Sequence, residues 1–262
     1  MDLGLADRTI VVTGGSSGVG LATVRALLDE GARVATCGRD ADRLAKVAAD
    51  LGTGHDRLLT GVCDVRDAVA VGDFVRRTAE EFGGIDGLVN NAGQSRMKGL
   101  EDSTAEDWRD ELELKFAGVL NPLQAARPHL AVSAAASVVN INAVLAKQPE
   151  PRLITTSAAR AGILNLSKSL SVELAGEGIR VNSVCLGLID TGQWARRYAA
   201  SDSGRSYEDW QAELAADRGI ALGRLGRAEE VAFAVLTLLS PLASYITGTS
   251  IDVCGGVGRS IL

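Results

Sequence analysis

The sequence predicts an α/β fold, a doubly wound three-layer sandwich in which a mostly parallel sheet of about seven strands lies between two layers of helices. Three observations favour this fold. Short runs rich in β-branched residues alternate with longer segments that carry apolar residues at helical spacing. The short runs are of the apolar type typical of parallel strands that are buried on both faces. No proline-, glycine- or serine-rich linker and no internal repeat interrupts the chain, so we expect residues 1–262 to form a single domain.

The predicted strands follow one another in regular order. The first is followed by a glycine-rich turn and a helical stretch at 21–30, and the second comes after the turn signal at Gly31. Segments rich in alanine, leucine and charged residues separate the later strands. The candidate strands are residues 9–12, 33–36, 58–62, 87–90, 137–141, 180–185 and 250–253.

One segment, 192–226, breaks this alternation. It is polar and rich in arginine and tyrosine, and it is hard to place on the sheet. Because open α/β sheets bind ligands at the carboxyl ends of their strands, we predict that 192–226 forms a lid over a substrate cleft. A surface insertion without that role is the alternative.

Composition narrows the class of protein. Hydrophobic residues make up 46% of the chain and charged residues 23%, and the net charge of −6 gives no reason to expect nucleic acid or a membrane as partner. No apolar run approaches the ~20 residues that span a bilayer, and the first residues do not resemble a signal peptide. We therefore expect a cytoplasmic protein. The four cysteines lack the paired spacing of metal sites, so we expect reduced thiols and no metal.

A glycine-rich turn follows the first predicted strand. It reads Thr13-Gly14-Gly15-Ser16-Ser17-Gly18-Val19-Gly20 and leads into the first helix. Glycines allow a tight turn and close approach of the backbone to a pyrophosphate, and the N-terminus of the helix attracts its negative charge. We predict a dinucleotide site here. The alternative is a tight turn that binds no ligand.

Several motifs in the same order along the chain resemble those of the short-chain dehydrogenase/reductase family, whose fold is Rossmann-like. They are the glycine-rich turn 13–20, Asn90-Asn91-Ala92-Gly93, Gly223-Arg224-Leu225-Gly226 and Tyr245-Ile246-Thr247-Gly248. The resemblance covers nearly the whole chain. It implies a small-molecule substrate, a homodimer or homotetramer, and a nicotinamide cofactor. The residues expected at the cofactor are Gly14, Ser16, Ser17, Gly18, Val19, Gly20, Arg39, Asp64, Val65, Asn91, Ala92, Gly93, Arg160, Gly187, Ile189 and Thr191.

The end of the second strand favours NADP(H) over NAD(H). An acidic residue there would bind the ribose 2′-hydroxyl of NAD and repel a 2′-phosphate. This chain has Gly38 at that position and Arg39 beside it, and a guanidinium suits a phosphate in charge and geometry. A solvated surface role for Arg39 is the alternative, and Asp40 next to it weakens the positive field.

The catalytic side chains of the family are absent. The resemblance implies a tyrosine four residues before a lysine, together with a serine and an asparagine, and this chain has Thr156, Arg160, Ala143 and Lys115 at those positions. A tyrosine four residues before a lysine occurs nowhere else in the chain. We therefore regard Lys115, Asn142, Thr156 and Arg160 as candidate catalytic residues.

These candidates differ in their chemistry. A threonine hydroxyl is a far weaker acid than a phenol, and an arginine remains charged but can hold ribose hydroxyls. Desolvation would lower the pKa of Lys115 and make it an acid–base group, although it could instead fill space or pair with an acid. Asn142 could orient a carbonyl group or cap local backbone.

Three functions stay open at this point. The first is an NADP(H)-dependent reductase of a carbonyl, enone or imine with an unusual proton donor. The second is a non-redox lyase, isomerase or cyclase, and the third is a cofactor-binding pseudoenzyme. The predicted lid contains Trp194, Arg196, Arg197, Tyr198 and Arg205. These residues are suited to contact an aromatic or anionic substrate, and a solvated amphipathic helix is the alternative explanation.

Overall fold

A computed structural model describes residues 1–51, 56–95 and 97–260. Its main sheet has seven strands, all parallel, in the order β3-β2-β1-β4-β5-β6-β9 within this described part of the chain. The strands are β1 (Thr9–Thr13), β2 (Arg33–Gly38), β3 (Leu58–Val62), β4 (Gly87–Asn90), β5 (Ser137–Ala143), β6 (Arg180–Leu186) and β9 (Ser250–Val253). The predicted fold class is confirmed, and each of the predicted strands is found with its end moved by two residues at most.

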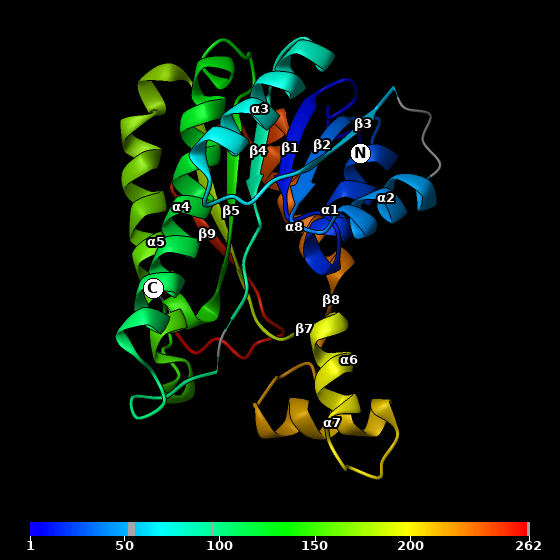
Figure 1. Ribbon diagram of the computed structural model, residues 1–262, viewed down its shortest axis with the longest axis vertical. Coiled ribbons are helices and arrows are strands. Elements are labelled where there is room, and N and C mark those ends of the chain that lie inside the picture. Colours follow the sequence, from blue (N-terminus) through cyan, green and yellow to red (C-terminus); the bar gives the residue numbers. More distant parts are fainter. Residues whose placement is uncertain (52–55, 96, 261–262) are drawn as a thin grey trace.

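Helices cover both faces of the sheet (Figure 1). One layer contains α1 (Gly18–Asp29), α2 (Ala41–Asp50) and α8 (Ala228–Leu239). The other contains α3 (Ala68–Phe82), α4 (Ala105–Leu130) and α5 (Ile154–Glu173). Among the described residues, no helix is long and apolar enough to cross a membrane.

Successive strand residues bury their side chains in opposite layers. Val11 and Val138 pack in the core beneath α3, α4 and α5, whereas Val12 and Val139 pack in the core beneath α1 and α8. All four side chains are fully buried. Because both faces of each central strand are covered, consecutive strand residues such as these can both be apolar, instead of alternating with polar ones.

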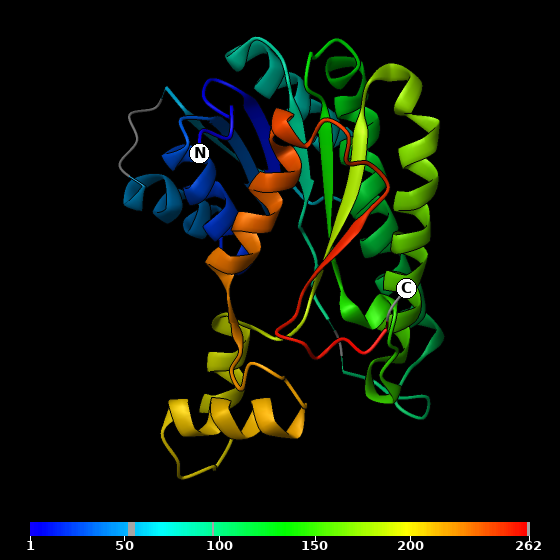
Figure 2. The same ribbon diagram turned by 180° about the vertical axis from the view of Figure 1, so that it is seen from behind.

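The segment between β6 and α8 stands apart from the sheet. Two short parallel strands, β7 (Ile189–Asp190) and β8 (Gly226–Arg227), pair at its base. Between them lie α6 (Gly192–Ala199) and α7 (Tyr207–Asp217), beyond the carboxyl ends of the strands and at the bottom of both views (Figures 1 and 2). The segment thus matches the range expected for a lid, and its closing role stays a prediction.

The lid segment has a small core of its own. Tyr198 and Tyr207 approach to 5.1 Å between ring centroids, and Trp210 stacks on Tyr207 at 6.1 Å. Beside these rings, Ala215, Ile220 and Leu225 form a separate buried cluster. A segment with its own packed core can keep its internal shape if it moves relative to the sheet.

An ion pair fixes the end of the lid segment to the start of α8. The Glu230 carboxylate accepts hydrogen bonds from Arg224 Nη2 at 2.6 Å and from the Arg227 backbone N–H at 2.7 Å. These two interactions lower the pKa of Glu230 to about 2. The carboxylate also completes the capping of the first turn of α8.

Replacing Glu230 by Gln should therefore destabilise the protein in a pH-dependent way. The folded-state pKa lies below the ordinary value of about 4.3, so the stabilisation is present above that value and is lost as the pH falls through the folded-state pKa. Because the pair is partly exposed, we expect a loss of about 1 kcal/mol at pH 7. Urea unfolding of both proteins at several pH values measures this loss of unfolding free energy. A loss that stays constant down to pH 2 would contradict this explanation, and Glu80→Gln, which breaks an exposed pair on α3, is the control.

Candidate active site

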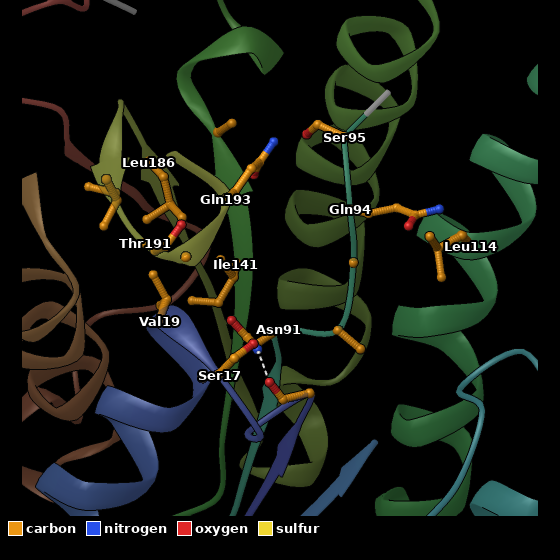
Figure 3. Close-up of a pocket in the computed structure, with 18 of the residues that line it drawn as sticks. Ser17, Val19, Asn91, Gln94, Ser95, Leu114, Ile141, Leu186, Thr191 and Gln193 are labelled. Carbon is orange, nitrogen blue, oxygen red and sulfur yellow. Dashed lines mark hydrogen bonds between the residues drawn. The ribbon is translucent and has the colours of Figure 1, made fainter. Parts of the chain in front are cut away.

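A cavity of about 890 Å³ opens at the carboxyl ends of the central strands and extends to α6. This volume is in the range of cofactor and ligand sites. Figure 3 shows Leu186 and Thr191 on one side of the cavity and Gln94 and Ser95 on the other. All the residues that the sequence assigned to a cofactor line this cavity, from the glycine-rich turn to Thr191.

The glycine-rich turn is held tightly against the end of β4. Gly14 has φ +72°, and a Cβ added there would lie 2.9 Å from Ala92 Cα. A Cβ on Gly20 would lie 2.4 Å from Asn91 Nδ2. That amide donates hydrogen bonds to Thr13 O at 2.9 Å and to Gly14 O at 3.1 Å. Figure 3 marks one hydrogen bond of Asn91 with a dashed line. Gly14 and Gly20 are therefore required by close approach, as the motif predicts.

The N-terminus of α1 is open to an anion. Its N-cap residue, Ser17, makes no side-chain capping bond, and the first turn contains no acidic residue. Ser17, Gly18, Val19 and Gly20 all line the cavity. Backbone N–H groups without an internal partner and the partial positive charge of the helix therefore lie where a pyrophosphate would bind.

The second strand ends in a basic corner. Asp40 is occupied by its own helix, because it accepts a hydrogen bond from Arg43 N at 3.0 Å and pairs with Arg43 Nε at 3.1 Å. Arg39 is exposed, lines the cavity and lies beside Gly38, where an added Cβ would be 3.5 Å from Ser16 Oγ. Arg39, Arg43 and Ser16 thus all line the cavity near the end of β2. Sequence reasoning missed Arg43, whose only signal is its position in the first turn after Asp40.

Asp64 and Gly187 lie at the two ends of the cavity. The hydrogen bond from Arg66, at 2.6 Å, is the main cause that lowers the pKa of Asp64, and the charge of Arg39 contributes. At the other end, a Cβ on Gly187 would lie 2.8 Å from Cys254 Cα, and the Gly187 N–H donates to Val253 O. The loop from Gly187 to Thr191 is thereby fixed against the end of β9.

Three of the four candidate catalytic residues, Lys115, Asn142 and Arg160, line the cavity. Thr156 does not. Its side chain is fully buried, and its hydroxyl donates a hydrogen bond to Glu111 Oε1 at 2.9 Å. A threonine is too short to carry its hydroxyl from the α5 backbone into the cavity as a tyrosine would.

Asn142 and Arg160 support each other through the backbone. Asn142 Nδ2 donates to Arg160 O at 3.0 Å, and its Oδ1 accepts from Ala143 N at 2.9 Å. The amide of Asn142 is therefore used in local capping, the alternative that its position at a strand end suggested. Burial lowers the pKa of Arg160, and the nearby Glu111 charge opposes this shift. Ala143 offers the cavity only a methyl group.

Glu111 is the functional candidate that sequence reasoning missed. It is 2% exposed and lies one helical turn before Lys115 on α4, with 3.2 Å between Oε1 and Nζ. Lys115 Nζ also donates to Gln94 O. Glu111 Oε2 has no hydrogen-bond partner among the described residues. The only sequence signal for Glu111 is its position four residues before Lys115. This spacing of an acid and a base is common on exposed helices, so it does not indicate a buried pair.

Three polar side chains form one connected network at the cavity. Thr156 donates to Glu111, Glu111 pairs with Lys115, and the Lys115 ammonium reaches the cavity wall. Lys115 therefore pairs with an acid, as its alternative interpretation required, and it also faces the space where a substrate would lie. In a site of low polarity such a pair can hold and release a proton.

The buried pair predicts a strong energetic coupling. Replacing Glu111 by Gln leaves the Lys115 charge without its carboxylate and should cost about 3 kcal/mol of unfolding free energy. Replacing Lys115 by Met should cost a similar amount, and the double variant should be more stable than the sum of the two losses predicts. Urea unfolding at pH 7 measures all three. Additive losses would disprove the coupling, and Arg127→Gln, which breaks an exposed pair with Glu177, is the control.

Comparisons with known proteins agree with this architecture. Residues 14–258 match the family model described as enoyl-(acyl carrier protein) reductase. The chain is 37% identical over 254 residues, 96% of each sequence, to cis-4-hydroxycyclohexanecarboxylate dehydrogenase of Sinomonas cyclohexanicum. It is 46% identical to a short chain oxidoreductase of Pseudomonas aeruginosa PAO1 that contains an atypical catalytic center. The apo structure of that protein superposes with a TM-score of 0.95 over 99% of this chain and 100% of the other. Its NADPH-bound structure superposes with a TM-score of 0.92 over 97% and 98%. The chain belongs to the short-chain dehydrogenase/reductase family.

Proposed function

We propose that this protein is an NADP(H)-dependent oxidoreductase that acts on a small organic carbonyl, enone or imine, with Lys115 as its acid–base group. The observation that carries the proposal is the position of Lys115, a residue that lines the cavity and whose ammonium lies 3.2 Å from the buried Glu111 carboxylate. The 46% identical oxidoreductase with an NADPH-bound structure supports the choice of cofactor.

The residues present fit NADP(H). The open N-terminus of α1 and the close approach of Gly14 to Ala92 suit a pyrophosphate. Arg39 suits a 2′-phosphate, because the neighbouring Asp40 carboxylate is paired with Arg43. Arg160, half-buried and positively charged, would hold the hydroxyls of the nicotinamide ribose. The bound cofactor would supply or accept the hydride.

The protein's own part in the reaction is to manage charge on the substrate. As a carbonyl group is reduced, its oxygen gains negative charge and needs a proton. Lys115 Nζ can donate that proton, and Glu111 beside it favours the protonated ammonium between turnovers. Iminium and conjugated acceptors need less assistance than ketones, so they suit a site that lacks the tyrosine.

Two further expectations accompany the proposal. We expect a homodimer or homotetramer, as the family resemblance implies, and a cytoplasmic location. Size-exclusion chromatography with light scattering tests the first.

Arg39→Ser should weaken NADPH binding and leave NADH binding nearly unchanged. Loss of a charge-assisted contact to the 2′-phosphate costs about tenfold or more in affinity. Calorimetric titration of both cofactors measures the difference, with the exposed Arg25→Ser on α1 as control. Equal weakening for NADPH and NADH would rule out a phosphate contact.

Lys115→Met should reduce kcat about 100-fold, the size of a lost general acid, while NADPH affinity stays the same. The assay follows NADPH absorbance with ketone, enone and imine acceptors over a range of pH, and Lys46→Met on the exposed face of α2 is the control. An unchanged kcat would exclude Lys115 as the acid. If the parent protein oxidises NADPH with none of these acceptors, the proposal fails and a non-redox enzyme or a binding protein remains.

A further inference from the structure

The cavity is strongly basic at the end farther from the glycine-rich turn. Lys115 and Arg160 lie on the sheet side, and three arginines approach from the lid segment. Those three are Arg196, Arg197 and Arg218. Three acidic residues line the cavity among the described residues. Asp40 and Asp64 lie beside Arg39, so Glu150 is the only acid at this end within the described part of the chain.

Part of this positive charge is already balanced. Lys115 pairs with Glu111, and Arg218 Nη1 lies 2.5 Å from Glu150 Oε1. Arg197 makes no ion pair with any described residue. It is half-buried, and its guanidinium carbon lies 4.5 Å from the centroid of the Trp194 ring, which fixes its direction.

Arg197 is held in unfavourable electrostatic surroundings. Burial lowers its pKa, and the neighbouring Arg218 charge lowers it further, with Glu150 opposing. A partly desolvated guanidinium beside a second one gains most from an anion that comes between them.

The lid arginines are fixed close to the candidate active site. Glu150, which pairs with Arg218, donates its backbone N–H to Ser157 Oγ at 3.3 Å. Ser157 follows Thr156, the residue that bonds to Glu111. The Arg218–Glu150 pair on the lid side and the Thr156–Glu111 bond on the sheet side therefore meet at the first turn of α5.

Apolar side chains line part of the cavity between these two interactions, beside polar ones such as Gln94, Ser95 and Gln193. The apolar ones are Met97, Val144, Leu145, Leu153, Leu188 and Trp194. They would cover the carbon skeleton of a substrate, because moving apolar surface from water into an apolar environment lowers the free energy.

We propose that this end of the cavity binds a substrate that carries one carboxylate on an apolar body, with Arg197 as the carboxylate-binding residue. The charge of Arg218 is largely balanced by Glu150, so Arg218 adds only a weak attraction for an anion. The site therefore suits a single anion bound in a bidentate manner. The proposal rests on the proposed function for the reacting carbonyl, which would face Lys115, while the anion site itself does not depend on turnover.

Calorimetric titration of the NADPH-loaded protein with hexanoate, hexanamide and hexyl phosphate tests the anion site directly. We expect hexanoate to bind about tenfold tighter than hexanamide, as a charge-assisted bidentate contact requires. Arg197→Gln should abolish the preference, and Arg197→Lys should retain part of it. Arg205→Gln is the matched control, because Arg205 lies on the same lid segment, pairs with Glu213 and does not line the cavity. Circular dichroism establishes that each variant is folded.

Turnover gives the second readout. With 3-, 4- and 5-oxo acids of six to eight carbons and their methyl esters, Arg197→Gln should raise KM for the acids about tenfold. It should leave kcat and KM for the esters unchanged.

Each contrary outcome has a definite meaning. Equal binding of hexanoate and hexanamide, or the same loss in Arg205→Gln as in Arg197→Gln, would overturn the proposal. Hexyl phosphate that binds tenfold tighter than hexanoate would overturn the carboxylate in favour of a phosphate ester. If the protein takes up no NADPH, the proposed function fails, and the hexanoate titration of the cofactor-free protein and of Arg197→Gln still decides the anion site.

Discussion

The hydrogen bonds between the end of β1 and the end of β4 are the constraint on which the site depends. Asn91 donates from its side chain to Thr13 O and Gly14 O, and the Asn91 and Ala92 N–H groups both donate to Thr13 Oγ1 at 3.0 Å. The glycine-rich turn is thereby held at the point where the order of the strands reverses, which is where parallel sheets of this type form a crevice. The glycines at 14 and 20 are the consequence, since a side chain at either would collide with this connection.

A buried polar network lies where the resemblance placed the family's catalytic hydroxyl, and our proposal assigns the acid–base role to it. Glu111 is a charged group at 2% exposure, and such a group is stable only when it is paired and hydrogen-bonded. Lys115 and Thr156 supply those interactions from α4 and α5. The chain thus has a buried carboxylate–ammonium pair beside Thr156, and Lys115 of this pair lines the cavity.

The lid segment contributes charged residues to the cavity and is attached to the sheet domain by an ion pair. Its small core and the β7–β8 pair give it a defined shape, and the Arg218–Glu150 bridge attaches it to the first turn of α5. Arg197 is then presented to the cavity without a carboxylate of its own among the described residues. An anionic substrate would complete a charge arrangement that the protein leaves incomplete.

The sequence by itself determined the strands, the dinucleotide turn and the absence of the family's catalytic side chains. These features are encoded locally, because hydrophobic periodicity and turn residues act within about ten residues of chain. Only the tertiary structure decided which charges meet. Thr156 and Glu111 are 45 positions apart and Arg218 and Glu150 are 68, and the packing of helices and of the lid, not local pattern, brings them together. For the same reason the sequence placed Thr156 at the cavity, whereas packing keeps its short side chain behind the wall.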